Sequence, residues 1–276
     1  MNFSKGIPDE AKTMVVVPTL ITGFENINDL LEGLEVRFLA NRDANLYFAL
    51  LTDFKDAASE HLPADESLLL AIKNGIIELN KKYGRTSNDT FFLFHRSRKW
   101  NKYDKIWMAY ERKRGKLGDL NACLRGNDND CFSEIVGDTS YFSQIKYIIT
   151  LDTDTQLPRD TAWKMIGTMA HPLNHPVYNE KKKRITEGYG ILQPRVSNSL
   201  PATESSIYAR LFGNDPGTDP YTKASSDVYQ DLFEEGSFIG KGIYDVDAFE
   251  LALKDKLPEN RILSHDLLEG CMFVRV

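Results

Sequence analysis

Short apolar runs alternate with longer segments of helical periodicity along the first half of the chain. The apolar runs at Met14–Leu20, Asn45–Phe54 and Phe91–Arg96 predict buried strands. Apolar residues recur at helical spacing in Asn26–Arg42 and Asp65–Gly84, which predicts helices between those strands. This alternation is typical of an α/β fold, in which a mostly parallel sheet is covered by helices on both faces.

The rest of the chain predicts a looser mixture of elements. A basic loop and helix over Lys113–Gly126 come between two expected strands, and no internal repeat or low-complexity linker interrupts the pattern. Further strands are expected at Lys105–Arg112, Lys146–Asp152 and Tyr189–Val196, helices at Arg159–Ala170 and Pro201–Gly213, and an amphipathic segment at Asp245–Asp255.

Three of the expected strands end at residues of possible functional interest. Pro18 is expected to end the first strand, Asp53 the second, and Asp152 the strand that begins at Lys146. Ligands of parallel α/β sheets bind beyond the carboxyl ends of the strands. The convergence of these three residues therefore indicates a ligand-binding site at the carboxyl edge of the sheet.

The composition is that of an ordinary globular protein and narrows the choice of ligands. The chain has 276 residues, 42% of them hydrophobic and 27% charged. Its formal charge of −6 argues against nucleic acid as a partner, so an anionic ligand requires a local cluster of cations. Three cysteines without C-x-x-C spacing suit reduced thiols better than disulfides or zinc.

Neither a signal peptide nor a membrane span is expected within the chain. The first residues are polar, and no apolar run approaches the roughly 18 residues of a transmembrane helix. The strand-like ending, "CMFVRV", is interpreted as a cut through a larger protein. We therefore expect this fragment to be soluble and any membrane segment to lie outside it.

The D-x-D pair of Asp152 and Asp154 has two interpretations. In a strand, alternate residues share a face, so the two carboxylates would repel each other unless a cation lay between them. Mg²⁺ or Mn²⁺ would relieve that repulsion, with substrate phosphates completing the coordination. The alternative is a solvated Asx-turn, which the nearby Pro158 supports and which the spacing alone favours.

A basic stretch around Gly115 also has two interpretations. Arg112, Lys113, Arg114 and Lys116 suit a phosphate-binding loop, because glycine lets backbone approach an anion and arginine binds it with two donors. The plainer interpretation is a solvated turn. Neither G-x-x-x-x-G-K-[ST] nor a G-x-G-x-x-G after the first strand is present, which argues against both of those nucleotide motifs.

Two further segments carry candidate chemistry. Asp266, preceded by His265, is either a helix cap or a general base. Gly240 lies in a glycine-rich segment beside Lys241, which suits either a sugar-binding rim or a β-turn.

Taken together, these segments resemble the family-2 type of glycosyltransferase. The resemblance rests on a first strand ending in Pro-Thr, R-G-K-L-x-x-L-N, D-x-D, G-x-x-G-K-G and a late acidic residue. More closely, "VVVPTL", "ITLDTDTQLPRD", "DPYTKASSDVYQDLFEEGSFIGKGIYDVDAF" and "ENRILSHDLLEG" resemble the glycosyltransferase domain of cyclic β-1,2-glucan synthases. The resemblance covers nearly the whole chain.

This resemblance implies a fold and an activity. The fold would be one GT-A (Rossmann-like) three-layer sandwich over residues 1–276, with a nucleotide-sugar-binding half at 14–155 and an acceptor and catalytic-base half at 156–276. The activity would be metal-dependent transfer of glucose, with inversion, from UDP-glucose to a growing β-1,2-glucan. The full-length protein would lie at the cytoplasmic face of the bacterial inner membrane.

The resemblance also assigns roles to individual residues. Asp154 would bind Mg²⁺ or Mn²⁺ and Asp266 would be the catalytic base, although His265 stands where the common motif has an acidic residue. Gly240 and Lys241 would belong to the acceptor rim. The donor UDP-glucose would be bound by Pro18, Thr19, Asp53, Arg114, Lys116 and Asp152.

Two other functions compete with this one. A sugar-1-phosphate nucleotidyltransferase also combines an α/β sheet with metal-binding aspartates, but it needs a G-x-G-T-R-like loop where this chain has "PTLITGFEN". A non-catalytic nucleotide-sugar or glucan-binding module of a larger synthase would bind donor without turnover.

Overall fold

A computed structural model describes residues 1–84, 89–126, 131–194 and 238–253. The expected helix at Pro201–Gly213 and the expected base Asp266 lie outside these residues. None of the helices within the described ranges is long and apolar enough to cross a bilayer.

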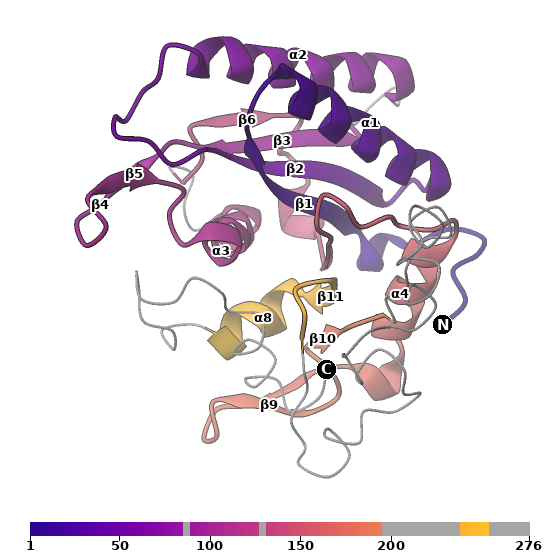
Figure 1. Ribbon diagram of the computed structural model, residues 1–276. Helices are drawn as coiled ribbons and strands as arrows, with labels where there is room; N and C mark the ends of the chain where they lie inside the picture. The colour runs from indigo at the N-terminus through magenta and orange to yellow at the C-terminus, as the bar shows by residue number, and fades with distance from the viewer. Residues whose placement is uncertain (85–88, 127–130, 195–237, 254–276) are drawn as a thin grey trace, which may run out of the picture.

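The centre of the fold is a seven-stranded sheet with the order β10-β11-β7-β1-β2-β3-β6 (Figure 1). Four neighbouring strands, β7, β1, β2 and β3, run parallel, and the three outer strands are antiparallel to their neighbours. The strands are β1 (Thr13–Ile21), β2 (Leu46–Phe54), β3 (Phe91–Arg96), β6 (Glu134–Val136), β7 (Tyr147–Thr150), β10 (Ile191–Leu192) and β11 (Gly242–Asp245).

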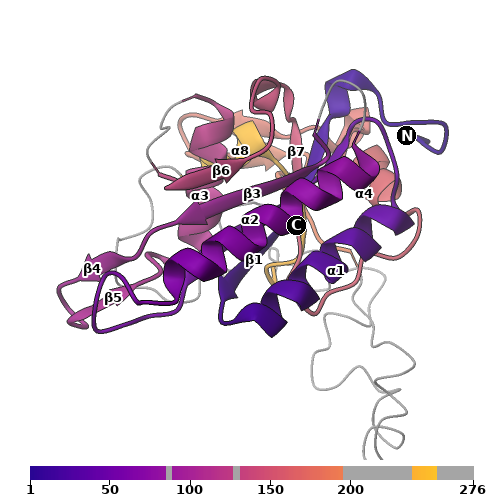
Figure 2. The same ribbon diagram turned by 90° about the horizontal axis from the view of Figure 1, so that it is seen from above.

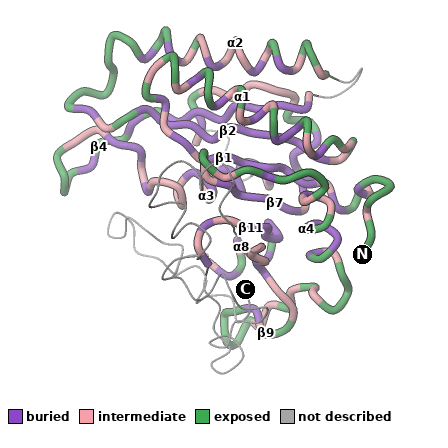
Figure 3. Tube along the Cα trace, turned by 45° about the vertical axis from the view of Figure 1, so that its right-hand side comes forward, coloured by how far each residue is buried: buried purple, intermediate pink, exposed green. Residues whose placement is uncertain are grey.

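Helices cover both faces of this sheet, so the predicted three-layer α/β fold is confirmed. Side chains of β1 alternate between two cores: Val15 and Val17 face α1, α2 and α4, whereas Met14 and Val16 face α3 and α8. The central strands are buried along their length (Figure 3). The α-helices of the described segments are α1 (Phe24–Ala40), α2 (Asp65–Tyr83), α3 (Arg112–Leu124), α4 (Thr161–Met169) and α8 (Val246–Leu253).

Helices α1 and α2 lie side by side across one face of the sheet (Figure 2). Gly75 of α2 allows their close approach, because a Cβ atom there would lie 2.2 Å from Cδ1 of Leu31 on α1. This contact fixes the position of α1, and α1 in turn contributes to the site described below.

The prediction that β1 ends at Pro18 is wrong, because β1 continues to Ile21. Proline lacks the N–H that a strand normally donates. The carbonyl of Val16 accepts from Leu151 on the β7 side, so Pro18, two residues later, faces the same side where β7 has already ended at Thr150. The missing donor therefore removes no ladder hydrogen bond.

The prediction of a strand over Lys105–Arg112 followed by a basic loop also needs correction. Strand β5 covers only Ile106–Met108 and pairs with β4 (Lys99–Asn101) in a separate hairpin. Glu111 and Arg112 take positive φ angles of 52° and 48°, which ends the extended backbone and turns the chain into α3. The basic residues consequently lie in the first turns of a helix.

Smaller elements complete the described structure. A second hairpin pairs β8 with β9, next to α8. The bounds of the remaining elements are β8 (Val177–Asn179), β9 (Arg184–Glu187), and the 3₁₀ helices at Asp9–Ala11, Phe142–Gln144 and Pro172–Asn174.

Candidate functional site

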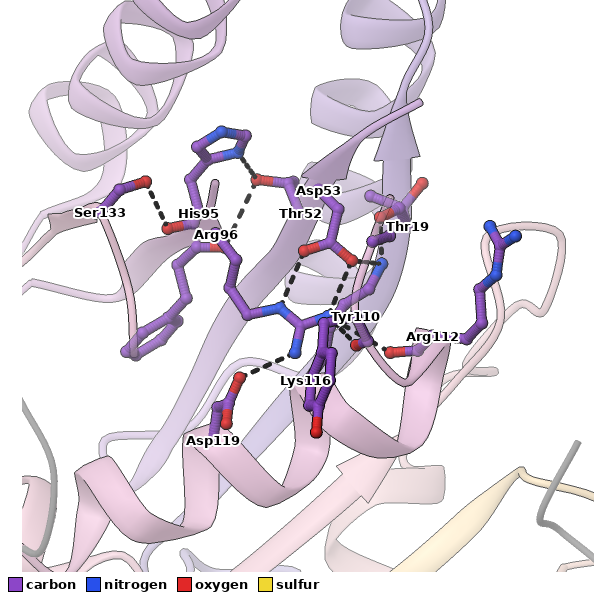
Figure 4. A network of polar contacts seen from close by, with 12 residues as sticks. Thr19, Thr52, Asp53, His95, Arg96, Tyr110, Arg112, Lys116, Asp119 and Ser133 are labelled. Carbon is purple, nitrogen blue, oxygen red and sulfur yellow. Dashed lines mark hydrogen bonds and ion pairs between the residues drawn. The ribbon is translucent and has the colours of Figure 1, made fainter. Parts of the chain in front are cut away.

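Polar side chains gather at the carboxyl edge of the parallel strands, as the sequence predicts. Thr19 and Asp53 come from the ends of β1 and β2, and the D-x-D segment follows β7 directly. The first turns of α3 bring basic residues to the same edge (Figure 4). Two charge clusters result, one buried and one partly exposed.

The buried cluster centres on Asp53. Arg96, the last residue of β3, binds both of its carboxylate oxygens, with Nε–Oδ1 and Nη2–Oδ2 distances of 2.8 and 3.0 Å. Nζ of Lys116 lies 3.0 Å from Asp53 Oδ2 and also donates to the carbonyl oxygen of Thr19. Nη1 of Arg96 donates to Asp119 at 2.7 Å, so two cations face two anions (Figure 4).

This cluster is almost completely removed from water. The exposed fractions of Asp53, Arg96 and Lys116 are 2, 3 and 4%. Burial lowers the pKa of Lys116 despite the charge of Asp53 beside it. Burial also acts to lower the pKa of Arg96, but its hydrogen bonds to the two aspartates raise it overall. Asp53 and Lys116 were both predicted to bind UDP-glucose. In the structure they form an ion pair with each other, and their contacts with UDP-glucose stay predictions.

The partly exposed cluster centres on Asp152. Lys113 Nζ lies 2.7 Å from Oδ1 of Asp152, and Lys241 Nζ lies 2.8 Å from Oδ2. Lys113 also donates to the carbonyl oxygen of Gly240 at 2.5 Å. Burial raises the pKa of Asp152, but the two ammonium groups together lower it below the usual value. The structure thus brings together three residues predicted to bind the donor or the acceptor: Asp152, Gly240 and Lys241.

Asp154, the predicted metal ligand, is exposed, and its Oδ1 lies 3.4 Å from Oγ1 of Thr155. No group of three His, Cys, Asp or Glu side chains that could hold a metal ion occurs among the described residues. Mg²⁺ and Mn²⁺ are hard cations that one or two protein carboxylates bind together with substrate phosphates. Asp154 fits that arrangement, whereas both oxygens of Asp152 are already engaged by lysines.

The remaining predicted residues lie around these clusters. Pro18 is half-buried near the end of β1, and Asp266 lies outside the described residues. Nη2 of Arg114 lies 3.5 Å from Oε2 of Glu111, and its buried Nη1 has no hydrogen-bond partner in the described structure. This nitrogen is a buried donor in the first turn of α3 without an acceptor among the described residues.

Sequence reasoning did not predict roles for Arg96 or Arg37, and it gave Lys113 a role only as part of the basic stretch suited to phosphate. Arg96 is the last residue of β3 and Asp53 the last but one of β2, so the position of Arg96 at the end of an apolar strand was a usable signal. Arg37 lies within α1 and contacts the D-x-D segment from the face of the sheet that α1 covers, which is opposite to the face covered by α3. Nothing in the local pattern around Arg37 indicates this contact.

A buried histidine lies next to the network. His95, on β3, is 1% exposed, and its Nδ1 lies 2.9 Å from Oγ1 of Thr52. Its Nε2 is buried and makes no hydrogen bond to any described residue. Burial lowers the pKa of His95 from its usual 6.5 to about 4, against the opposing charges of Asp53 and Asp65. The ring is neutral at neutral pH.

This histidine should make the fold acid-sensitive. Between pH 6.5 and about 4 the unfolded chain binds a proton at His95 that the folded chain does not, so stability falls as the pH falls. The loss should reach about 3 kcal/mol near the lower limit. Urea unfolding across that range should show a steeper decline for the native chain than for His95→Gln. Equal slopes for the two proteins would contradict the assignment.

Comparison with known proteins was consistent with the resemblance seen in the sequence. No family model matches the chain. It is 46% identical over 269 residues to the cyclic beta-(1,2)-glucan synthase NdvB of Rhizobium meliloti (strain 1021). The match covers 97% of this chain but only 9% of the NdvB sequence. The chain is therefore similar over nearly its whole length to one segment of a cyclic beta-(1,2)-glucan synthase.

Proposed function

We propose that this chain is a GT-A type glycosyltransferase domain that transfers glucose from UDP-glucose to a growing β-1,2-glucan with inversion at the anomeric carbon. One observation carries the proposal: an exposed aspartate, Asp154, lies at the carboxyl edge of a parallel sheet beside basic residues of α3. The similarity to a cyclic beta-(1,2)-glucan synthase supports the same activity. Contact with the membrane would occur through segments outside this chain, at the cytoplasmic face of the bacterial inner membrane.

The start of α3 is suited to a diphosphate. Its helix N-terminus carries partial positive charge, and Arg112, Lys113 and Arg114 add three cations within its first turn. Arg112 is partly exposed and bound to Asp56 at 2.7 Å, so its guanidinium can exchange that carboxylate for a phosphate oxygen. These groups would stabilise the negative charge that develops on the departing UDP.

A divalent cation would be held by Asp154 together with the diphosphate. When bound, such a cation neutralises charge on the leaving group. Asp152, kept ionised by Lys113 and Lys241, would accept hydrogen bonds from the ribose or the donor sugar. Lys241 and Gly240 would then connect the donor site to the acceptor rim.

The acceptor hydroxyl requires a base. Inversion takes place in a single displacement, so one carboxylate is enough to remove the proton of that hydroxyl. Asp266 is our candidate for this role from the sequence resemblance. Donor and acceptor must also be held in line, which a rigid sheet edge favours.

The test is an assay of UDP release from UDP-glucose with Mn²⁺ or Mg²⁺, accompanied by mass spectrometry of the glucan products. We expect metal-dependent UDP release and products that grow by hexose units. Asp266→Asn should abolish turnover while retaining UDP binding. Metal-dependent UDP binding without turnover, both in this chain and in a synthase containing it, would favour a non-catalytic binding module instead.

A further inference from the structure

We propose that Arg37 is a positioning residue that holds the D-x-D turn, residues 152–155, in the shape required to bind the donor and its metal. The part of this proposal that concerns donor and metal rests on the proposed function. The part that concerns the anchoring of the turn does not. Arg37 lies in the last turn of α1, far in sequence from the turn that it contacts.

The contacts of Arg37 converge on the backbone of the turn. Nη2 donates to the carbonyl oxygens of Thr155 at 2.7 Å, Thr153 at 2.8 Å and Asp152 at 3.3 Å. Nε donates to Thr155 as well, at 3.1 Å. One guanidinium therefore binds three of the four carbonyl groups in the turn. Nη2 reaches all three carbonyl groups, and Nε holds the guanidinium plane against Thr155; the shorter side chain of lysine offers neither the reach of Nη2 nor the second donor.

These contacts hold the turn from the face of the sheet opposite to helix α3. Arg37 reaches the carbonyl groups from α1, whereas Lys113 of α3 binds the carboxylate of Asp152 from the other face of the sheet. In Figure 1, α1 and α3 lie on opposite sides of the sheet. With its carbonyls turned toward α1, the segment leaves the side chain of Asp154 exposed to solvent.

The sequence of α1 is adapted to this arrangement one turn to either side of Arg37. A Cβ atom on Gly33 would lie 2.9 Å from Nη1 of Arg37, so the glycine leaves room for the guanidinium. Asn41 donates to the carbonyl of Leu157 at 3.1 Å and accepts from the backbone N–H of Ala162 at 3.1 Å. Asn41 thus anchors the later part of the same loop and makes no hydrogen bond to residues 152–155.

Positioning and electrostatics make different predictions for the replacement of Arg37. Burial lowers the pKa of Arg37, and the charge of Asp154 raises it, so the two groups interact. If charge alone mattered, loss of Arg37 would strengthen cation binding at Asp154, because a nearby positive charge would be gone. If the turn needs its anchor, loss of Arg37 would weaken that binding. The complex of UDP with Mn²⁺ still carries net negative charge, so loss of a cation would also disfavour UDP itself. Arg37→Lys keeps the charge and changes the contacts, and this variant therefore separates the two roles.

The experiment compares the 276-residue chain with three variants in two measurements. Arg37→Met removes the donors and the charge, Arg37→Lys keeps the charge, and Asn41→Ala perturbs the later part of the loop. Hydrogen exchange of residues 152–157 is measured without ligand, and calorimetry gives the affinity for UDP in the presence of Mn²⁺. Neither measurement depends on turnover.

We expect Arg37→Met to speed exchange in residues 152–157 and to weaken Mn²⁺-dependent UDP binding by about 10- to 100-fold. Arg37→Lys should recover little of this loss, because its ammonium nitrogen lies one bond short of the Nη2 position and has no counterpart of the Nε donor. Asn41→Ala should speed exchange nearer Ala162 and change the affinity by less than about twofold.

A fourth variant separates the role of Arg37 from general stability. Gly33→Ala adds a methyl group against the guanidinium, yet alanine favours a helix interior more than glycine does. We expect weaker Mn²⁺-dependent UDP binding without a lower unfolding temperature.

Unchanged exchange in Arg37→Met would overturn the anchoring. Equal or tighter Mn²⁺-dependent UDP binding would overturn the positioning role. If the native chain bound no UDP with Mn²⁺, the proposed function would fail, and with it the positioning role toward donor and metal. The exchange measurement would still decide whether Arg37 anchors the turn.

Discussion

Replacing Arg96 with methionine should lower the free energy of unfolding by about 3–5 kcal/mol, which is a large part of the stability of a typical domain. The guanidinium of Arg96 binds Asp53 with two hydrogen bonds and Asp119 with a third. Methionine fills similar space but leaves Asp53, which is 2% exposed, with Lys116 as its remaining cation. The cost comes mainly from buried charge that has lost its partner.

Urea unfolding followed by circular dichroism measures this loss as a lower midpoint at an unchanged slope. Lys82→Met is the matched control, because it removes a cation from a surface pair with Glu35, whose N–O distance is 2.7 Å. Solvent screens that pair, so the control should unfold close to the native midpoint. If Arg96→Met also unfolded near the native midpoint, the buried network would not have the energetic role assigned to it.

The central sheet could be predicted because its strands are long and buried on both faces. Strands β1 and β2 each have nine residues, nearly all buried, and their sequences are consequently continuous apolar runs. The outer strands β6 and β11 have only three and four residues. Such short segments show no usable periodicity, and their pairing with β3 and β7 depends on tertiary contacts.

The candidate site could be predicted only where its residues belong to strand ends or local motifs. Asp53 lies at the end of one apolar run, and the D-x-D pair follows another. Parallel strands alone therefore place these residues together at the carboxyl edge of the sheet. The contacts of Arg37 and Lys113 depend on which helix covers which face of the sheet. The periodicity of a helix shows which of its faces is buried but not which distant loop that face will meet.

The structure also changes the interpretation of the basic stretch. The sequence suggested that Gly115 allows an anion to approach the backbone, but this glycine lies inside α3. A Cβ atom there would lie 2.6 Å from both Cβ of Glu111 and the carbonyl oxygen of Tyr110. Glycine is therefore needed at position 115 for packing, because a larger residue would clash with Glu111 and Tyr110. An anion at this site would meet side chains and the helix N-terminus rather than a glycine loop.

Replacing Asp154 with asparagine should reduce UDP release from UDP-glucose by at least about a hundredfold, if the proposed function is correct. Asparagine has nearly the same shape but lacks the charge that a hard divalent cation requires. Asp154 is exposed, so its replacement should leave the fold intact and the unfolding temperature unchanged. The measurement is the initial rate of UDP release as a function of Mn²⁺ concentration, which should saturate at a higher concentration in the variant.

Asp160→Asn is the matched control, since it makes the same chemical change six residues further along the loop. Asp160 is exposed and has a φ angle of 65°, a conformation that asparagine adopts readily, so we expect native rates. Asp152→Asn should behave differently from both, because it leaves Lys113 and Lys241 without their shared carboxylate and should weaken donor binding. Native rates and an unchanged Mn²⁺ dependence in Asp154→Asn would remove Asp154 from the metal site. Because Asp152 is already bound by two lysines, any metal would then need ligands from outside the D-x-D turn.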